Sequence, residues 1–76
     1  MNFTDFEKLP HVESALQHPH QIVYSDGEIL LIFCTVSKVY VAECLEGCEA
    51  AFADKIMKEP VVRLQTSNQK LHKLLI

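Results

Sequence analysis

The residues with the clearest potential for chemistry are two cysteines and two histidines. Cys44 and Cys48 lie four residues apart in a segment predicted to be helical, so both thiols would project from one side of a helix. His18 and His20 flank a proline in the step His-Pro-His. Two thiolates and two imidazoles are a suitable tetrahedral ligand set for zinc, which makes these four residues candidate metal ligands.

A structural role competes with this zinc hypothesis. The histidine pair precedes the cysteines on a separate predicted loop, so only folding could bring the four residues together. Cys48 also falls in an apolar helical stripe with Leu45 and Phe52, where a thiol packs as a small hydrophobic side chain. We therefore predict no cofactor and no metal, and we keep a Cys/His metal-binding or thiol-based site as the alternative function.

The sequence contains no complete set of catalytic residues. A cysteine–histidine nucleophile pair would also need an orienting third group and an oxyanion site. The two glycines, Gly27 and Gly47, form no glycine-rich loop that could supply one, and Cys34 lies in an apolar run that predicts an inert core thiol. Carboxylate pairs such as Asp5 and Glu7 are typical of helix capping. We therefore predict that the protein is not an enzyme.

Composition restricts the class of protein further. The chain has 76 residues, 49% of them hydrophobic, and a formal net charge of −3, which predicts one small globular domain over residues 1–76. The acidic balance argues against binding to a phosphate backbone. Three cysteines, an N-terminus without a signal-peptide pattern and no run of about 20 apolar residues predict a cytoplasmic protein that does not enter a membrane.

The elements that would position these residues are organised around one apolar run. Ile29 to Cys34 are six consecutive apolar residues behind an Asp-Gly turn signal at residues 26–27. This run is too continuous for a half-exposed strand, so it predicts a central strand with both faces of the sheet covered. Since the chain has few helices, the alternative is that a second copy covers one face, as a homodimer.

The remaining elements follow from apolar spacing and turn signals. Thr4 to Glu7 has the form of a capping box, after which Pro10 either follows a short helical turn or opens a helix that runs to Gln17. Further strands are predicted at 21–24, 39–42 and 61–66, and further helices at 45–59 and 68–76, the last capped by Ser67. The predicted fold class is α+β, in the order α-β-β-β-α-β-α: a small, mostly antiparallel sheet of a three-strand meander plus one further strand, packed against helices.

The most suggestive binding feature is the C-terminal tail from Lys70 to Ile76, a short amphipathic element. Its leucines either anchor a partner or fold back to cover the sheet. We predict a small non-enzymatic protein–protein interaction module, acting as a regulator, an inhibitor or an accessory subunit of a larger protein. The candidate partner-binding residues are Tyr40, Leu71, Leu74 and Leu75.

A second alternative uses the aromatic residues of the predicted strands. Tyr24 and Tyr40 could face solvent and, with Arg63, form a stacking platform for single-stranded nucleic acid. Two tyrosines on an acidic chain give this hypothesis less support than the protein-binding one.

Overall fold

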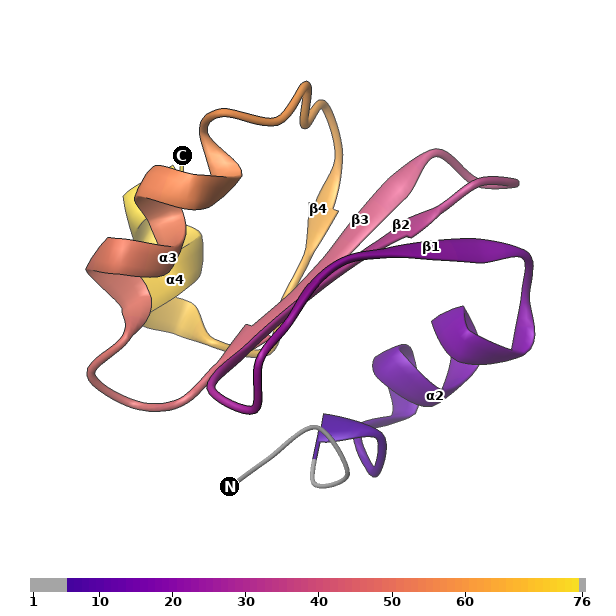
Figure 1. Cartoon of the computed structure of the whole chain (residues 1–76), viewed down its shortest axis with the longest axis horizontal. Coiled ribbons are helices and arrows are strands. Elements are labelled where there is room, and N and C mark those ends of the chain that lie inside the picture. Colours follow the sequence, from indigo (N-terminus) through magenta and orange to yellow (C-terminus); the bar gives the residue numbers. More distant parts are fainter. Residues whose placement is uncertain (1–5, 76) are drawn as a thin grey trace.

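In a computed structural model that describes residues 6–75, a four-stranded sheet separates one helix from two others (Figure 1). The helix α2 lies on one side of the sheet, and α3 and α4 lie on the other. The predicted α+β class and element order are confirmed. The elements are α2 (Pro10–Gln17), β1 (His20–Ser25), β2 (Ile29–Cys34), β3 (Val39–Cys44), α3 (Glu49–Ile56), β4 (Leu64–Gln65) and α4 (Gln69–Leu75).

The strands lie in the order β1-β2-β3-β4, so β2 is an interior strand as predicted. The first three strands form an antiparallel meander, whereas β4 pairs parallel to β3 after the crossover through α3. The tight Asp-Gly turn joins β1 to β2: the Asp26 carboxylate accepts hydrogen bonds from the amides of Glu28 and Ile29, each at 3.0 Å. Gly27 takes a φ of +90°, which glycine adopts without a steric penalty.

The continuous apolar run of β2 fills both cores at once. Because successive side chains of a strand point to opposite faces, Ile29 and Leu31 pack under α3 and α4, while Leu30 and Ile32 pack under α2. The chain's own helices therefore cover both faces of this strand, and the homodimer stays a prediction. The α3/α4 cluster holds Ile29, Leu31, Tyr40, Ala42, Cys44, Phe52, Ala53, Ile56 and Leu71; the α2 cluster holds Phe6, Val12, Ala15, Leu30, Ile32 and Val41.

The helix predicted over residues 45–59 begins four residues later than expected, at Glu49. The strand β3 continues to Cys44, which pairs with Ile29, and the chain then turns through Gly47 at a φ of +93°. A left-handed residue cannot continue a right-handed helix, so Gly47 separates β3 from α3. Cys44 and Cys48 are therefore not an i, i+4 pair on one helix, which corrects the expectation on which the zinc hypothesis rested.

The ends of the chain differ from the prediction in smaller ways. Pro10 opens α2, which resolves the two alternatives for that residue, and the capping box at Thr4 lies outside the described residues. Of the predicted strand 61–66, only Leu64–Gln65 form a strand. The predicted cap of the last helix was wrong: Asn68, not Ser67, accepts the hydrogen bond from the Leu71 amide, at 3.0 Å.

Replacing Gly47 by alanine distinguishes the observed turn from the predicted helix. In a helix, alanine would stabilise the fold by about 1 kcal/mol. At a φ of +93° we expect alanine to destabilise it by about 1–2 kcal/mol, because the added Cβ opposes that backbone conformation while meeting no atom within 4 Å. Urea unfolding measures the difference. Ala51→Gly, an exposed position inside α3, is the matched control and should cost about 1 kcal/mol; a stabilised G47A would contradict the turn.

Candidate functional site

A buried carboxylate in β3 is the centre of a polar network that joins distant parts of the chain. Glu43 is 3% exposed and lies on the α2 side of the sheet, directly opposite Leu30 of β2. Its Oε2 atom accepts hydrogen bonds from His11 Nε2 of α2, at 2.5 Å, and from the Ser67 amide, at 2.8 Å. Its Oε1 atom accepts the Ser67 hydroxyl, also at 2.8 Å. One side chain thus joins α2, β3 and the segment that leads into α4.

This network contains a serine, a histidine and a carboxylate, but not in a hydrolytic order. In a catalytic triad the histidine lies between the serine and the acid, so that the imidazole can take the serine proton. Here Glu43 lies between His11 and Ser67, and both of them donate to it. The serine hydroxyl donates to a carboxylate and not to an imidazole, so the order differs from that of a hydrolytic triad, and the network joins distant parts of the fold.

A second buried carboxylate lies beside the first. Glu49, at the start of α3, accepts hydrogen bonds from the Gly47 amide at 2.9 Å and from Asn68 Nδ2 at 3.1 Å. The bond from Asn68 is the largest cause that holds the pKa of Glu49 below its usual value. Asn68 Nδ2 also lies 3.5 Å from Cys44 Sγ. Asn68 therefore caps α4 and joins it to both α3 and β3.

The two carboxylates border a hollow of about 420 Å³ between the start of the described chain and α4. Within residues 6–75, every buried polar side-chain atom has a hydrogen-bond partner. Burial raises the pKa of the Cys44 thiol to about 11, and the neighbouring Glu49 adds to this shift. The thiol is therefore protonated at neutral pH, and a protonated thiol is a poor nucleophile. The lining includes Phe6, Leu9, Glu43, Cys44, Leu45, Glu46, Glu49, Ser67, Asn68 and Lys70.

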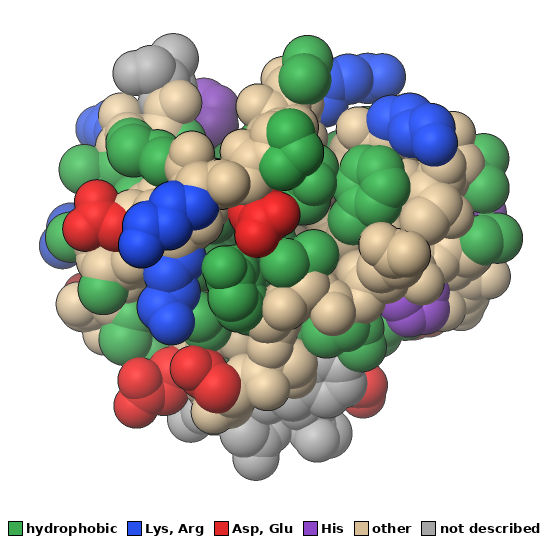
Figure 2. Space-filling view, turned by 45° about the horizontal axis from the view of Figure 1, so that its top comes forward, with side chains coloured by type: hydrophobic (Ala, Val, Ile, Leu, Met, Phe, Trp, Pro, Cys, Tyr) green, Lys and Arg blue, Asp and Glu red, His purple; other side chains and the backbone are tan. Residues whose placement is uncertain are grey.

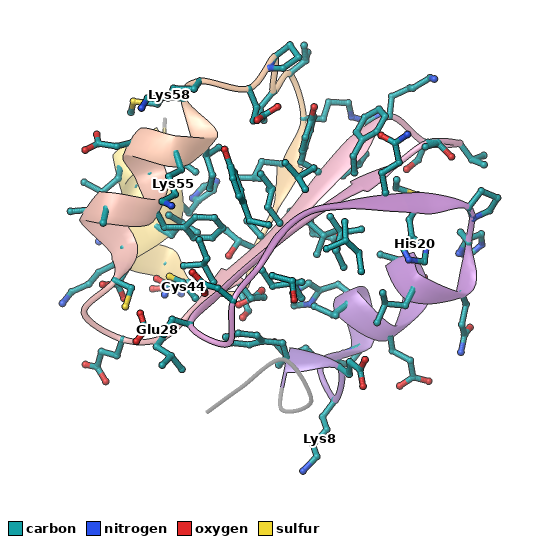
Figure 3. All side chains as sticks on the ribbon, viewed as in Figure 1. Lys8, His20, Glu28, Cys44, Lys55 and Lys58 are labelled. Carbon is teal, nitrogen blue, oxygen red and sulfur yellow. The ribbon has the colours of Figure 1, made fainter. Side chains whose placement is uncertain are left out.

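The fold does not bring the candidate metal ligands together. His20 pairs with Cys34 at one end of the β1–β2 hairpin, whereas Cys44 pairs with Ile29 at the opposite end of β2. Figure 3 shows His20 and Cys44 on opposite sides of the molecule. The His18 and His20 rings instead bond backbone carbonyls. In the part of the chain that the structure describes, no group of three His, Cys, Asp or Glu side chains is placed to hold a metal ion.

The candidate partner-binding residues divide between core and surface. Leu71 is fully buried in the α3/α4 cluster, and Tyr40 is 8% exposed, with its ring centroid 4.8 Å from that of Phe33. Neither offers a side chain to a partner in this fold, and the alternative that the tail packs back on the sheet is confirmed for Leu71. Leu74 is exposed and Leu75 is half-buried.

The predicted aromatic platform is absent from the described surface. Tyr40 is buried, and the Lys55 ammonium lies over the Tyr24 ring, 5.4 Å from its centroid. Since Tyr40 cannot reach a base, the two tyrosines do not present a pair of open faces for stacking.

Exposed apolar side chains gather where α3 ends. Met57 is 63% exposed and Val62 is 91% exposed, and both border a shallow hollow of about 310 Å³. Hydrophobic side chains surround an acidic one near the centre of this side of the molecule, with Lys and Arg groups to either side (Figure 2). We call Met57, Val61, Val62, Leu64 and Leu75 the C-terminal apolar patch; the buried Ile56 and the half-buried Glu59 complete the lining of its hollow.

The polar network was not predicted from the sequence because the third strand was predicted to end at Ala42. The alternation of Val39 and Val41 continues to Glu43, so a carboxylate at an inward position of an apolar strand was the available signal. The sequence offers no local signal for the role of His11, which meets Glu43 only in the folded chain.

Comparisons with known proteins identify no relative: no family model, curated protein or solved structure matches the chain. Among residues 6–75 there is also no helix with the length and apolar character needed to cross a bilayer.

Removing the Glu43 carboxylate should destabilise the fold strongly. In Glu43→Ala the His11 ring and both donors of Ser67 lose their acceptor, and a hydrogen bond to a charged group contributes about 1.5–3 kcal/mol. We expect a loss of about 3 kcal/mol in urea unfolding. Glu46→Ala removes an exposed carboxylate from the same hollow and should change stability by less than about 0.5 kcal/mol. Equal, small losses for both variants would contradict the role given to Glu43.

Asn68→Ser should raise the pKa of Glu49 toward its ordinary value. Serine caps a helix nearly as well as asparagine but lacks the amide Nδ2 that donates to Glu49, so the change removes this hydrogen bond and keeps the cap. Because the pKa is lowered in the folded state, the stabilisation by this bond is present above the unfolded carboxyl's pKa and is lost on acidification. The stability difference between wild type and N68S should therefore shrink as the pH falls below about 4.3.

Carboxyl carbon chemical shifts measure the pKa of Glu49, and urea unfolding at several pH values measures the stability difference. The pKa of Asp26 is held low by its own turn amides, so it should be the same in N68S and in the wild type. A Glu49 titration that does not move in the variant would show that Asn68 is not the cause.

Proposed function

We propose that this chain is a small non-enzymatic module that binds another protein through its C-terminal apolar patch. The observation that carries the proposal is the exposure of Met57 and Val62, at 63% and 91%, beside a hollow lined by further apolar residues. Contiguous apolar surface that the fold leaves open is typical of a protein interface. Burying a side chain of this size contributes about 1.5–3 kcal/mol, so the patch would supply part of the free energy of such a complex.

Charge around the patch favours an acidic partner. From Lys55 onward the chain holds five of its seven lysines and arginines, but one of its ten acidic residues, Glu59. Lys58 and Arg63 directly follow Met57 and Val62, and Lys58 lies at the end of α3 where the chain leaves for β4 (Figure 3). A positive rim around an apolar centre steers a negatively charged partner and discourages contact between two copies of this surface.

This interpretation keeps the predicted class and changes the residues that carry it. Of the four residues first considered, Leu75 belongs to the patch, while Tyr40 and Leu71 support the core beneath it. A regulator, an inhibitor or an accessory subunit would all work through such a surface. Three thiols that form no disulfide support action in the cytoplasm.

Affinity capture from cells of the source organism, followed by quantitative mass spectrometry, tests the proposal. The double variant Met57→Ser/Val62→Ser removes the two exposed apolar side chains of the patch and leaves every buried side chain unchanged. We expect it to recover at least tenfold less of the principal captured protein than the wild type does, because about 2 kcal/mol or more of apolar contact is lost.

The matched control is Val36→Ser/Ile22→Ser, which removes two exposed apolar side chains from the β2–β3 turn and from β1. This variant should capture the same protein as the wild type. Loss of capture in the control but not in the patch variant would move the interface elsewhere and overturn the proposal.

A further inference from the structure

A larger hollow lies beside α2, away from the C-terminal apolar patch. It has a volume of about 740 Å³ and opens between α2 and the end of the sheet that carries the β2–β3 turn. This volume falls within the range of about 300–1,000 Å³ that small-molecule sites occupy. Its apolar wall and floor come from Ala15 of α2 and from Val39 and Val41 of β3.

Two imidazoles line this hollow, and hydrogen bonds fix the proton of each ring. His11 Nε2 donates to the Glu43 carboxylate, and His18 Nδ1 donates at 2.8 Å to the carbonyl oxygen of Ser14, which can only accept. In the neutral ring the other nitrogen then carries a lone pair and no hydrogen. His11 Nδ1 and His18 Nε2 are therefore both hydrogen-bond acceptors, and no described side chain donates to either of them.

The other lining residues argue against two classes of ligand, which are charged molecules and metal ions. None of the described residues around the hollow is Asp, Glu, Lys or Arg, so the lining holds no permanently charged side chain to pair with an ionic ligand. The Cys34 thiol also lines the hollow, but Ser37 already bonds it, and no three candidate ligands among residues 6–75 converge on a metal position. The chemistry that remains is apolar contact combined with donation of a hydrogen bond to an imidazole.

We propose that the hollow beside α2 binds a neutral, largely apolar small molecule that carries a hydroxyl group, such as an alkyl alcohol or a phenol. The apolar body lies against Ala15, Val39 and Val41, and the hydroxyl donates to His18 Nε2 or His11 Nδ1. This site is independent of the C-terminal apolar patch, since it lies on the α2 side of the sheet.

Three matched probes test the chemistry by NMR titration of the backbone amides. We expect 4-propylphenol to shift the amides of Ser14, His18 and Val39 saturably. 4-Propylanisole has the same apolar body but no donor, and should bind about fivefold more weakly, the ratio expected for one net hydrogen bond. 4-Propylbenzoate carries a charge and should also bind at least fivefold more weakly than the phenol, because the lining offers it no counter-charge.

Two tryptophan variants test the place of binding. Ser14→Trp fills the hollow from the exposed side of α2, and should abolish the phenol-induced shifts while the circular dichroism spectrum stays that of a folded chain. Ala51→Trp puts the same ring on the exposed side of α3 and should leave binding unchanged. Equal binding of phenol and anisole, phenol shifts confined to Met57 and Val62, or full binding by folded S14W would each overturn the proposal.

Discussion

One buried carboxylate joins three segments of this small fold that are far apart in the sequence. Glu43 of β3 accepts hydrogen bonds from His11, which lies 32 residues earlier, and from Ser67, which lies 24 residues later. Burying a carboxylate costs several kcal/mol unless its oxygen atoms are paired, so the energy of this site is favourable only when α2, β3 and the segment before α4 are all in place. The position of each of these three elements therefore depends on the other two.

The surface follows from this interior arrangement. Glu43 and Glu49 accept hydrogen bonds inside the fold, and the two surfaces proposed for binding lie on the two sides of the sheet. On one side, the short β4 and the turn after α3 leave Met57 and Val62 exposed. On the other, α2 meets the sheet without closing the space above Val41, which leaves imidazole nitrogens beside an apolar floor.

The sequence was most informative where one local pattern decided the structure. Six apolar residues behind an Asp-Gly turn were enough to place β2 inside the sheet, and Pro10 marked the start of α2. It was least informative where long-range pairing decided. Pairing with Ile29 extends β3 to Cys44, and the positive φ of Gly47 delays α3; neither is visible in helical spacing. The polar network was missed for the same reason, since only the tertiary fold brings His11 to Glu43.

Hydrogen exchange of the Ser67 amide tests the central role of Glu43 most directly. Ser67 is an exposed residue outside the sheet and helices, and its amide donates to the Glu43 carboxylate. The amide should exchange at least a hundredfold more slowly than an unstructured serine amide, and as slowly as amides inside β3, since its bond breaks only when the network opens. Exchange at the unstructured rate, in a chain whose β2 and β3 amides remain protected, would show that Glu43 does not hold these elements together.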